Sequence, residues 1–239
     1  RRWIKEELID MIYGYKYKSF KIEKFHDEIM YFFKYLLENE PKEYDVNKMF
    51  NPSFKPLIEA SKKFEPLLKE LIEEYAKLDK EKKRKIKLAF KNNNQIKKLC
   101  NGSLTPGQYE EFKSVFSDKL KVFFEKLWDD YSHNKKIETN YGTVKEHFDL
   151  FVDEGHQEAL ICPFCGLSAL KPSKGEYRDA YDHYLPKSLF PFTSMNFKNL
   201  VPTCQTCNSR SEKGDKPVIY NRKKRQRVFF PFDTKLNIN

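Results

Sequence analysis

The sequence contains two short cysteine motifs, CPFCG at residues 162–166 and CQTCN at residues 204–208, with a long segment between them. Each motif places two cysteines three positions apart, and four thiolates are a complete ligand set for a tetrahedral zinc ion. Gly166 follows the second cysteine, where a residue without a side chain lets the backbone turn beneath a metal. We therefore expect one structural zinc ion, held by Cys162, Cys165, Cys204 and Cys207.

The overall charge indicates an anionic partner. The chain of 239 residues has 45 Lys and Arg against 35 Asp and Glu, a formal net charge of +10, which favours nucleic acid or an anionic membrane surface. It has no apolar run of about 18 residues and no signal-peptide pattern at its start. Paired cysteines in a reducing compartment favour metal over disulfides. We expect a soluble, cytoplasmic protein with no membrane span.

Helical periodicity dominates the chain up to about residue 155. Apolar residues recur at spacings of three and four through residues 54–78, which predicts one face of a long helix. Capping boxes at Thr105 to Gln108 and at Thr143 to Glu146 predict two further helix starts, and His147 is expected on a helix surface. The fold class is therefore predicted as α+β, mainly α, with a helical bundle over residues 1–155.

A strongly basic run, DKEKKRKIKLAFKNNNQIKK, lies within this helical part at residues 79–98. The pattern is typical of a solvated helix face, and a surface that contacts phosphates is the alternative. The sequence alone leaves both interpretations open.

The residue pattern changes after residue 155, where short apolar runs alternate with Pro, Gly and Ser. Small strands and turns around a metal site have this pattern, so we predict a second domain at residues 156–239. The segment DHYLP, residues 182–186, reads as a strand end because Pro186 lacks a backbone donor. It brings an acid and an imidazole, Asp182 and His183, into the interval between the cysteine pairs.

The order CPFC, DHYLP, KNLVPTCQTCN and KGDK resembles the HNH nucleases of the ββα-metal superfamily, in the version with two flanking cysteine pairs. The resemblance covers roughly residues 160–216. It implies that His183 is a general base and that Asn199 supports the loop that orients it. It also implies that Asp182 and Asn208 bind a catalytic Mg²⁺ or Mn²⁺. Neighbouring residues of a regular strand point to opposite faces, however, so Asp182 and His183 share one site only if the strand twists or bulges.

Further basic residues follow these motifs. Two of them come after Asn208 on an expected helix, and others belong to the basic segment at residues 221–227. Such side chains suit contacts to the nucleic-acid backbone and carry no information on sequence specificity. The candidates for nucleic-acid binding are Arg210, Lys213, Arg222, Lys223, Lys224 and Arg225.

These features predict a metal-dependent endonuclease that hydrolyses DNA phosphodiester bonds. The resemblance places such proteins in bacterial restriction or anti-phage defence, and an ATPase subunit or a second copy of the chain could dock on the helical domain. The alternative is a non-catalytic, zinc-containing module that binds nucleic acid. A third interpretation, a protein-interaction adaptor built on the helical bundle, is compatible with either.

Overall fold

The computed structural model describes residues 21–52, 54–55, 58, 64–107, 118–131, 134–155, 161–171, 179–209, 211–214, 216–221 and 224–230. Over these residues the protein is mainly helical and carries small antiparallel sheets, so the predicted α+β, mainly α class is confirmed.

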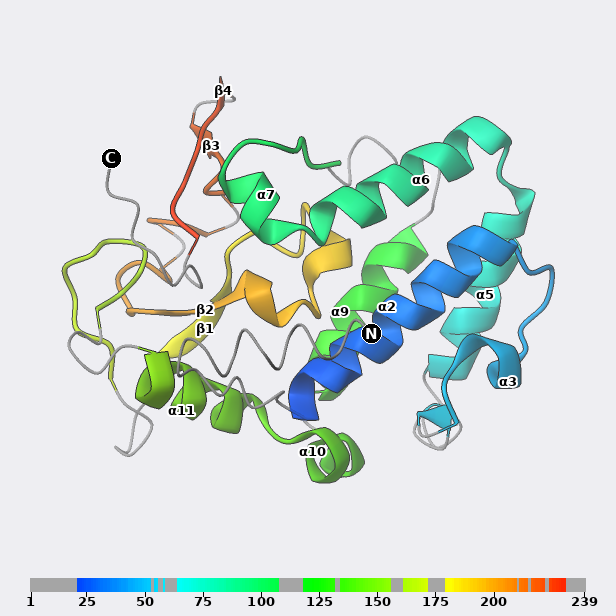
Figure 1. Cartoon of the computed structure of the whole chain (residues 1–239), viewed down its shortest axis with the longest axis horizontal. Helices are drawn as coiled ribbons and strands as arrows, with labels where there is room; N and C mark the ends of the chain where they lie inside the picture. The colour runs from blue at the N-terminus through cyan, green and yellow to red at the C-terminus, as the bar shows by residue number, and fades with distance from the viewer. Residues whose placement is uncertain are drawn as a thin grey trace, which may run out of the picture.

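The helices occupy the first part of the chain and the strands the last part. The helices are α2 (Lys21–Asn39), α3 (Val46–Met49), α5 (Phe64–Lys77), α6 (Lys80–Asn93), α7 (Ile96–Cys100), α9 (Asp118–Tyr131), α10 (Lys135–Tyr141) and α11 (Val144–Gly155). The strands and short 3₁₀ turns are β1 (Ala180–His183), η1 (Pro191–Thr193), η2 (Phe197–Asn199), β2 (Leu200–Thr203), β3 (Tyr220–Asn221) and β4 (Lys224–Arg225). Figure 1 shows the longer helices toward the right of the molecule and the strands toward its left.

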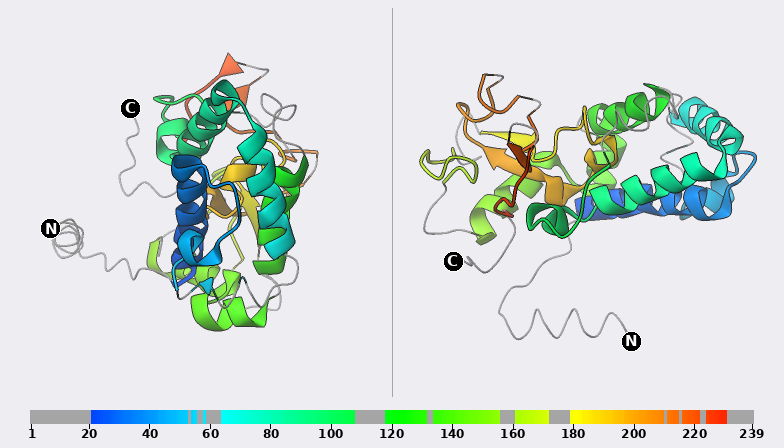
Figure 2. Two further views of the ribbon diagram at one scale, coloured as in Figure 1. Left: turned by 90° about the vertical axis from the view of Figure 1, so that its right-hand side faces the viewer. Right: turned by 90° about the horizontal axis from the view of Figure 1, so that it is seen from above.

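Aromatic packing holds the longer helices together. Phe33 of α2 stacks on Phe90 of α6 and on Phe124 of α9, with ring centroids 5.4 and 4.9 Å apart. Figure 2 shows α2 and α6 running side by side. Each aromatic side chain removes a large apolar area from water, so these rings supply much of the energy that fixes the helices.

Two of the predicted helix features lie at least partly within the described residues. The capping box at Thr143 is confirmed, because the Thr143 N–H donates to the Glu146 carboxylate at 2.8 Å and the Glu146 N–H donates to the Thr143 hydroxyl at 3.0 Å. In the predicted 54–78 stripe, α5 begins at Phe64, and Phe54 and Ile58 are also buried in the helical core. Gln108 of the other capping box lies outside the described residues.

The strands β1 and β2 form an antiparallel pair in which Asp182 lies opposite Val201 and His183 opposite Leu200. Leu200 belongs to the helical core, whereas Val201 belongs to a second apolar cluster with α7 and the C-terminal segment. The two faces of this sheet therefore pack on different cores, and alternation along β1 separates Asp182 from His183.

The predicted boundary near residue 155 does not separate two hydrophobic cores. The helical core includes four residues from the later segment, Phe192, Met195, Phe197 and Leu200. The second cluster in turn includes Ile96, Leu99 and Cys100 of α7. The change in composition after residue 155 therefore marks a change from helices to strands and turns. The apolar packing continues across it.

His147 is buried, so the expectation that it lies on a helix surface is wrong. It is 5% exposed, and its Nδ1 lies 2.7 Å from the hydroxyl of Tyr181 in β1. Its ring also contacts Phe197, with centroids 4.8 Å apart. Burial penalises the charged imidazolium and lowers the pKa of His147 to about 4.

This burial predicts a pH dependence of stability. The unfolded chain takes up a proton on His147 near pH 6.5, whereas the folded protein does so only near pH 4. The unfolded state thus binds more protons in this window, and stability falls as the pH is lowered through it. Between pH 7.5 and pH 5.5 this residue should account for a loss of about 1 kcal/mol.

The measurement is urea unfolding of the wild type and of His147→Gln at several pH values within this range. The glutamine does not titrate, so its curve should be flatter, and metal content is checked at each pH because thiolate ligands also take up protons. Parallel curves would contradict the assignment.

The described helices include none with both the length and the apolar character needed to cross a bilayer.

Candidate metal centre and His183 site

The structure brings the four predicted cysteines together. Their sulfur atoms all lie within 4.8 Å of one another, with Cys162 and Cys204 buried and Cys165 and Cys207 partly exposed. A tetrahedral ion with Zn–S bonds of about 2.3 Å requires sulfur atoms about 3.8 Å apart. The cluster fits one metal ion of this kind, and all four positions would be filled by protein.

Backbone hydrogen bonds shape the turn that carries the first cysteine pair. The Cys162 N–H donates to the Ser168 carbonyl and the Gly166 N–H to the Cys162 carbonyl, both at 2.8 Å. Gly166 has a positive φ of 63°, which glycine adopts without strain. Backbone N–H groups of Ser168 and Leu167 lower the pKa of Cys165 to about 6. Such donors favour the thiolate, which is the form that binds metal.

Asn199 fastens the loop between β1 and β2. It is fully buried, its side-chain oxygen accepts from the Leu185 N–H at 2.7 Å, and its amide donates to the Leu185 carbonyl at 3.0 Å. The same amide also donates to the Thr193 hydroxyl at 3.0 Å. These bonds span the whole loop, so Asn199 holds the residues that follow His183 in a fixed shape.

His183 is directed toward the helices. Its Nε2 lies 2.9 Å from the Ser194 carbonyl oxygen, and its ring meets Trp128 of α9 edge-on with centroids 4.9 Å apart. A carbonyl only accepts, so Nε2 carries the proton and the neutral ring has its lone pair on Nδ1. The side chain is 9% exposed, and burial lowers its pKa to about 4.

Asp182 makes a different set of contacts. Its carboxylate lies 2.6 Å from the ammonium of Lys213, which also donates to the His183 carbonyl at 2.7 Å. The Lys213 ammonium lies over the Phe164 ring, 5.6 Å from its centroid. Lys213 is only 7% exposed, so its prediction as a contact to nucleic acid disagrees with the structure. Its charge is already matched inside the protein, and breaking such a buried pair is costly.

Asn208 is exposed and directly follows Cys207. The sequence predicted a helix from this point, but residues 205–209 and 211–214 form turns. The Asn208 N–H donates to the Cys204 carbonyl at 2.9 Å, and the Gly214 N–H reaches the Ser209 carbonyl at 3.2 Å. These bonds close separate turns around the cysteine pair, so no regular helix forms over these described residues.

Arg225 has a structural role that the sequence did not indicate. Its guanidinium donates to the carbonyls of Leu99 and of Leu104, and to the Ile219 carbonyl at 3.0 Å. Nearby, the Val228 N–H donates to the Cys100 carbonyl at 2.9 Å. The predicted contact of Arg225 with nucleic acid disagrees with this geometry, because the guanidinium N–H groups already donate to backbone carbonyls. Lys224 is exposed, and Arg210, Arg222 and Lys223 lie outside the described residues.

Two contacts of His183 could not be found from sequence. Ser194 acts through its backbone carbonyl, which every residue has, and Trp128 comes from a helix more than fifty positions earlier. Trp128 is half-buried near the end of α9, where it packs against the helical core and meets the imidazole.

The chain is similar to a phage protein over part of its length. No family profile and no solved structure matches the chain. The chain is similar to Protein ea31 of Escherichia phage lambda, with 34% identity over 102 residues. That match covers 42% of this chain and 28% of the phage protein, so the chain spans just over a quarter of the relative's length.

Proposed function

We propose that this protein is a metal-dependent endonuclease that hydrolyses DNA phosphodiester bonds, with His183 as the general base. The observation that carries the proposal is the hydrogen bond from His183 Nε2 to the Ser194 carbonyl. It fixes the tautomer in which Nδ1 is the basic nitrogen, as a base that takes a proton from water requires. The lowered pKa keeps the imidazole neutral at pH 7.

The surrounding residues support this role. Asn199 holds the loop that carries Ser194, so it positions the carbonyl that orients the ring. For catalysis Nδ1 must reach a water molecule at the end of β1, because a base acts only within hydrogen-bond distance of the proton it removes. His183 is therefore assigned the proton transfer, and Asn199 is a positioning residue.

A divalent ion, Mg²⁺ or Mn²⁺, would stabilise the negative charge that develops on the phosphate. The oxygen atoms of Asp182 and Asn208 are the ligands that such hard cations prefer. Asp182 is held by Lys213 and lies on the opposite face of β1 from His183. An ion at this carboxylate would replace that pair, and it would act on the same phosphate as His183 only where the end of the strand twists. Asn208 is exposed and directly follows Cys207, so its side chain is accessible from solvent.

In this proposal the four-cysteine cluster binds zinc and does no chemistry. With every coordination position filled by sulfur, the metal has no open place for water or substrate. It joins the turn at residues 162–165 to the turn that follows β2, and so it holds the end of the β1–β2 sheet. Zinc binding then contributes to folding.

The test is conversion of supercoiled plasmid to nicked and linear forms by protein purified with its zinc, with and without added Mg²⁺ or Mn²⁺. Nicking that depends on the added ion supports the proposal. Binding of plasmid without any nicking would instead favour the non-catalytic nucleic-acid-binding module.

Asn208→Ala gives a sharper test of the metal assignment. Loss of one oxygen ligand should raise the Mg²⁺ concentration for half-maximal nicking by about tenfold or more, with zinc content unchanged. Asn140→Ala is the matched control, since Asn140 is an exposed asparagine on α10 whose amide bonds only its own helix. An Mg²⁺ titration identical to that of the control would remove Asn208 from the metal site.

A further inference from the structure

Net positive charge is high over one short helical segment. Residues 80–98, which form α6 and most of α7, contain nine Lys and Arg and a single acid, Glu81. Their net charge of +8 accounts for most of the +10 of the whole chain. No acidic residue occurs in the sequence between Lys82 and Gln108. This segment therefore dominates the electrostatic field of its side of the molecule.

The charges on α6 form an ordered row. Lys80, Arg84, Lys87 and Lys91 are all exposed and follow one another at spacings of four, three and four. Residues at these spacings lie on one helix face. At a rise of 1.5 Å per residue the row is about 16 Å long, which is the axial length of about five base pairs of duplex DNA.

Four of the nine basic residues have ion pairs within the described part of the chain. Lys82 lies 3.5 Å from Asp79 and Lys85 lies 4.0 Å from Glu81. Lys83 pairs with Glu40 at 2.7 Å and Arg84 with Glu81 at 2.9 Å. Lys80, Lys87 and Lys91 have no ion pair with any acidic side chain in the part of the chain that the structure describes. A solvated helix face usually intersperses both signs of charge, whereas this row presents one sign.

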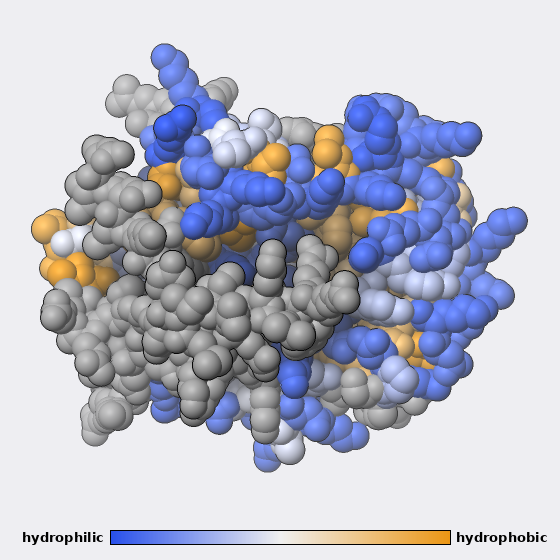
Figure 3. All heavy atoms as spheres, in the orientation of Figure 1, coloured by the Kyte–Doolittle hydropathy of each residue, from blue (hydrophilic) through white to orange (hydrophobic). Residues whose placement is uncertain are grey.

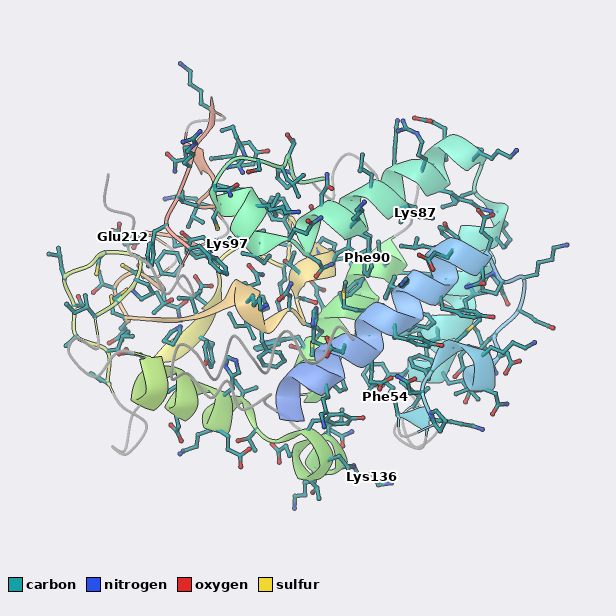
Figure 4. The ribbon with its side chains drawn as sticks, in the orientation of Figure 1. Phe54, Lys87, Phe90, Lys97, Lys136 and Glu212 are labelled. Carbon is teal, nitrogen blue, oxygen red and sulfur yellow. The ribbon has the colours of Figure 1, made fainter. Side chains whose placement is uncertain are left out.

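The helices that carry the row lie at the upper edge of the molecule in Figure 1. Figure 3 shows hydrophilic side chains along the upper edge of the molecule, where Figure 1 places α6, α7 and the β3–β4 hairpin, and also along its right-hand side. Figure 4 labels Lys87 and Lys97 on this edge and Lys136 on α10 at the opposite edge.

The same helices are fastened to the His183 loop. Phe90 of α6 packs edge-on against Phe192 of η1 with ring centroids 5.4 Å apart, and the Asn196 amide donates at 3.2 Å to the carbonyl of Asn94, the residue that follows α6. On α7, Ile96 and Leu99 pack in one cluster with Tyr184 and Leu185, the residues after His183. A polyanion held on α6 and α7 would therefore be held in fixed geometry to that loop.

We propose that the exposed face of α6 and α7, the α6–α7 surface, binds the phosphate backbone of double-stranded DNA and aligns it with the His183 site. An anionic membrane fits less well, because membrane-bound helices insert an apolar face. The apolar face of α6, with Ile86, Ala89 and Phe90, is buried in the helical core. The inference takes its substrate class from the proposed function, yet it concerns binding and can stand without cleavage.

The test is the salt dependence of DNA binding by two variants that each lose two charges. Lys87→Gln/Lys91→Gln removes charge from the row, and Lys135→Gln/Lys136→Gln removes the same charge from exposed positions on α10. Glutamine is a good helix former, so both variants should fold, which thermal melting checks. The probe is a labelled 30-base-pair duplex of mixed sequence, and Kd is measured without added divalent ion so that no cleavage occurs.

Each phosphate contact contributes about 0.9 to the slope of log K against log salt concentration. The α6 variant should lower the slope by about 1.8 and weaken binding at least about tenfold at 0.1 M salt, whereas the α10 variant should match the wild type. Equal effects of the two variants would mean that only net charge matters, and no effect of either would mean that DNA lies elsewhere. Both results overturn the proposal.

A second arm measures binding to vesicles with anionic headgroups. Loss of vesicle binding in the α6 variant, with unchanged DNA affinity, would assign the surface to lipid and also overturn the proposal. A protein that binds DNA through this surface but never nicks plasmid would support the inference and end the nuclease proposal, so the two failures are distinguishable.

Discussion

His183→Ala should fold, retain its zinc, bind duplex DNA with unchanged affinity and cleave it at least about 100-fold more slowly than the wild type. General-base catalysis contributes about 10² to 10⁴ in rate, and nothing else in the described contacts of His183 offers a nitrogen lone pair in its place. The zinc cluster and the α6–α7 surface use other residues, so binding and cleavage should respond separately.

The matched control is His147→Ala. His147 is also buried, and burial lowers its pKa to about 4, as it does for His183. It bonds Tyr181 and is assigned no chemistry, so this variant should lose stability but keep its cleavage rate per folded molecule. If alanine leaves a cavity that unfolds the His183 variant, His183→Asn preserves a polar side chain there and gives the same test. Cleavage near the wild-type rate in either folded His183 variant would refute the assignment of the base.

Cys204→Ser should lose its zinc and most of its resistance to unfolding. Loss of a structural metal is among the changes that cost more than about 4 kcal/mol, because metal-binding energy is part of the folding energy. Cys204 is 5% exposed and lies at the end of β2, so an unfilled cluster releases the strand that pairs with β1.

Cys100→Ser is the control for this prediction. Cys100 is also a buried thiol, in the cluster around α7, and burial raises its pKa to about 12, which makes it an inert packing group. It should keep one zinc per chain and lose only a modest amount of stability. The measurements are metal analysis after dialysis and the unfolding midpoint. A Cys204→Ser protein that retains zinc and melts with the wild type would contradict the assignment.

The residues that sequence reasoning placed well are those whose chemistry depends on spacing along the chain. The cysteine cluster could be predicted because each pair lies within one local turn. The helix cap at Thr143 could be predicted because a capping box is a four-residue pattern. For the same reason, alternation along a strand correctly indicated that Asp182 and His183 would contact different neighbours.

The errors concern long-range packing. A basic residue is predicted from sequence as a surface contact. Lys213 instead pairs with the partly buried carboxylate of Asp182, and Arg225 donates to backbone carbonyls more than a hundred positions away. Burial of His147 against β1 likewise depends on how α11 meets the sheet. Such contacts leave no local pattern, because they are decided by which elements the apolar cores bring together.

The packing of the C-terminal segment against α7 affects how the protein folds during synthesis. The Leu99 carbonyl accepts a hydrogen bond from Arg225, and the Cys100 carbonyl accepts one from the Val228 N–H. Ile96 and Ile219 pack in the same apolar cluster beside β1 and β2. During synthesis α7 emerges well before its partners, so the apolar side of α7 stays uncovered until residues beyond 228 have left the ribosome. Contacts this distant in sequence form late and expose the chain to aggregation meanwhile. For a nuclease, the same delay would keep the His183 loop unsupported until translation of this region is complete.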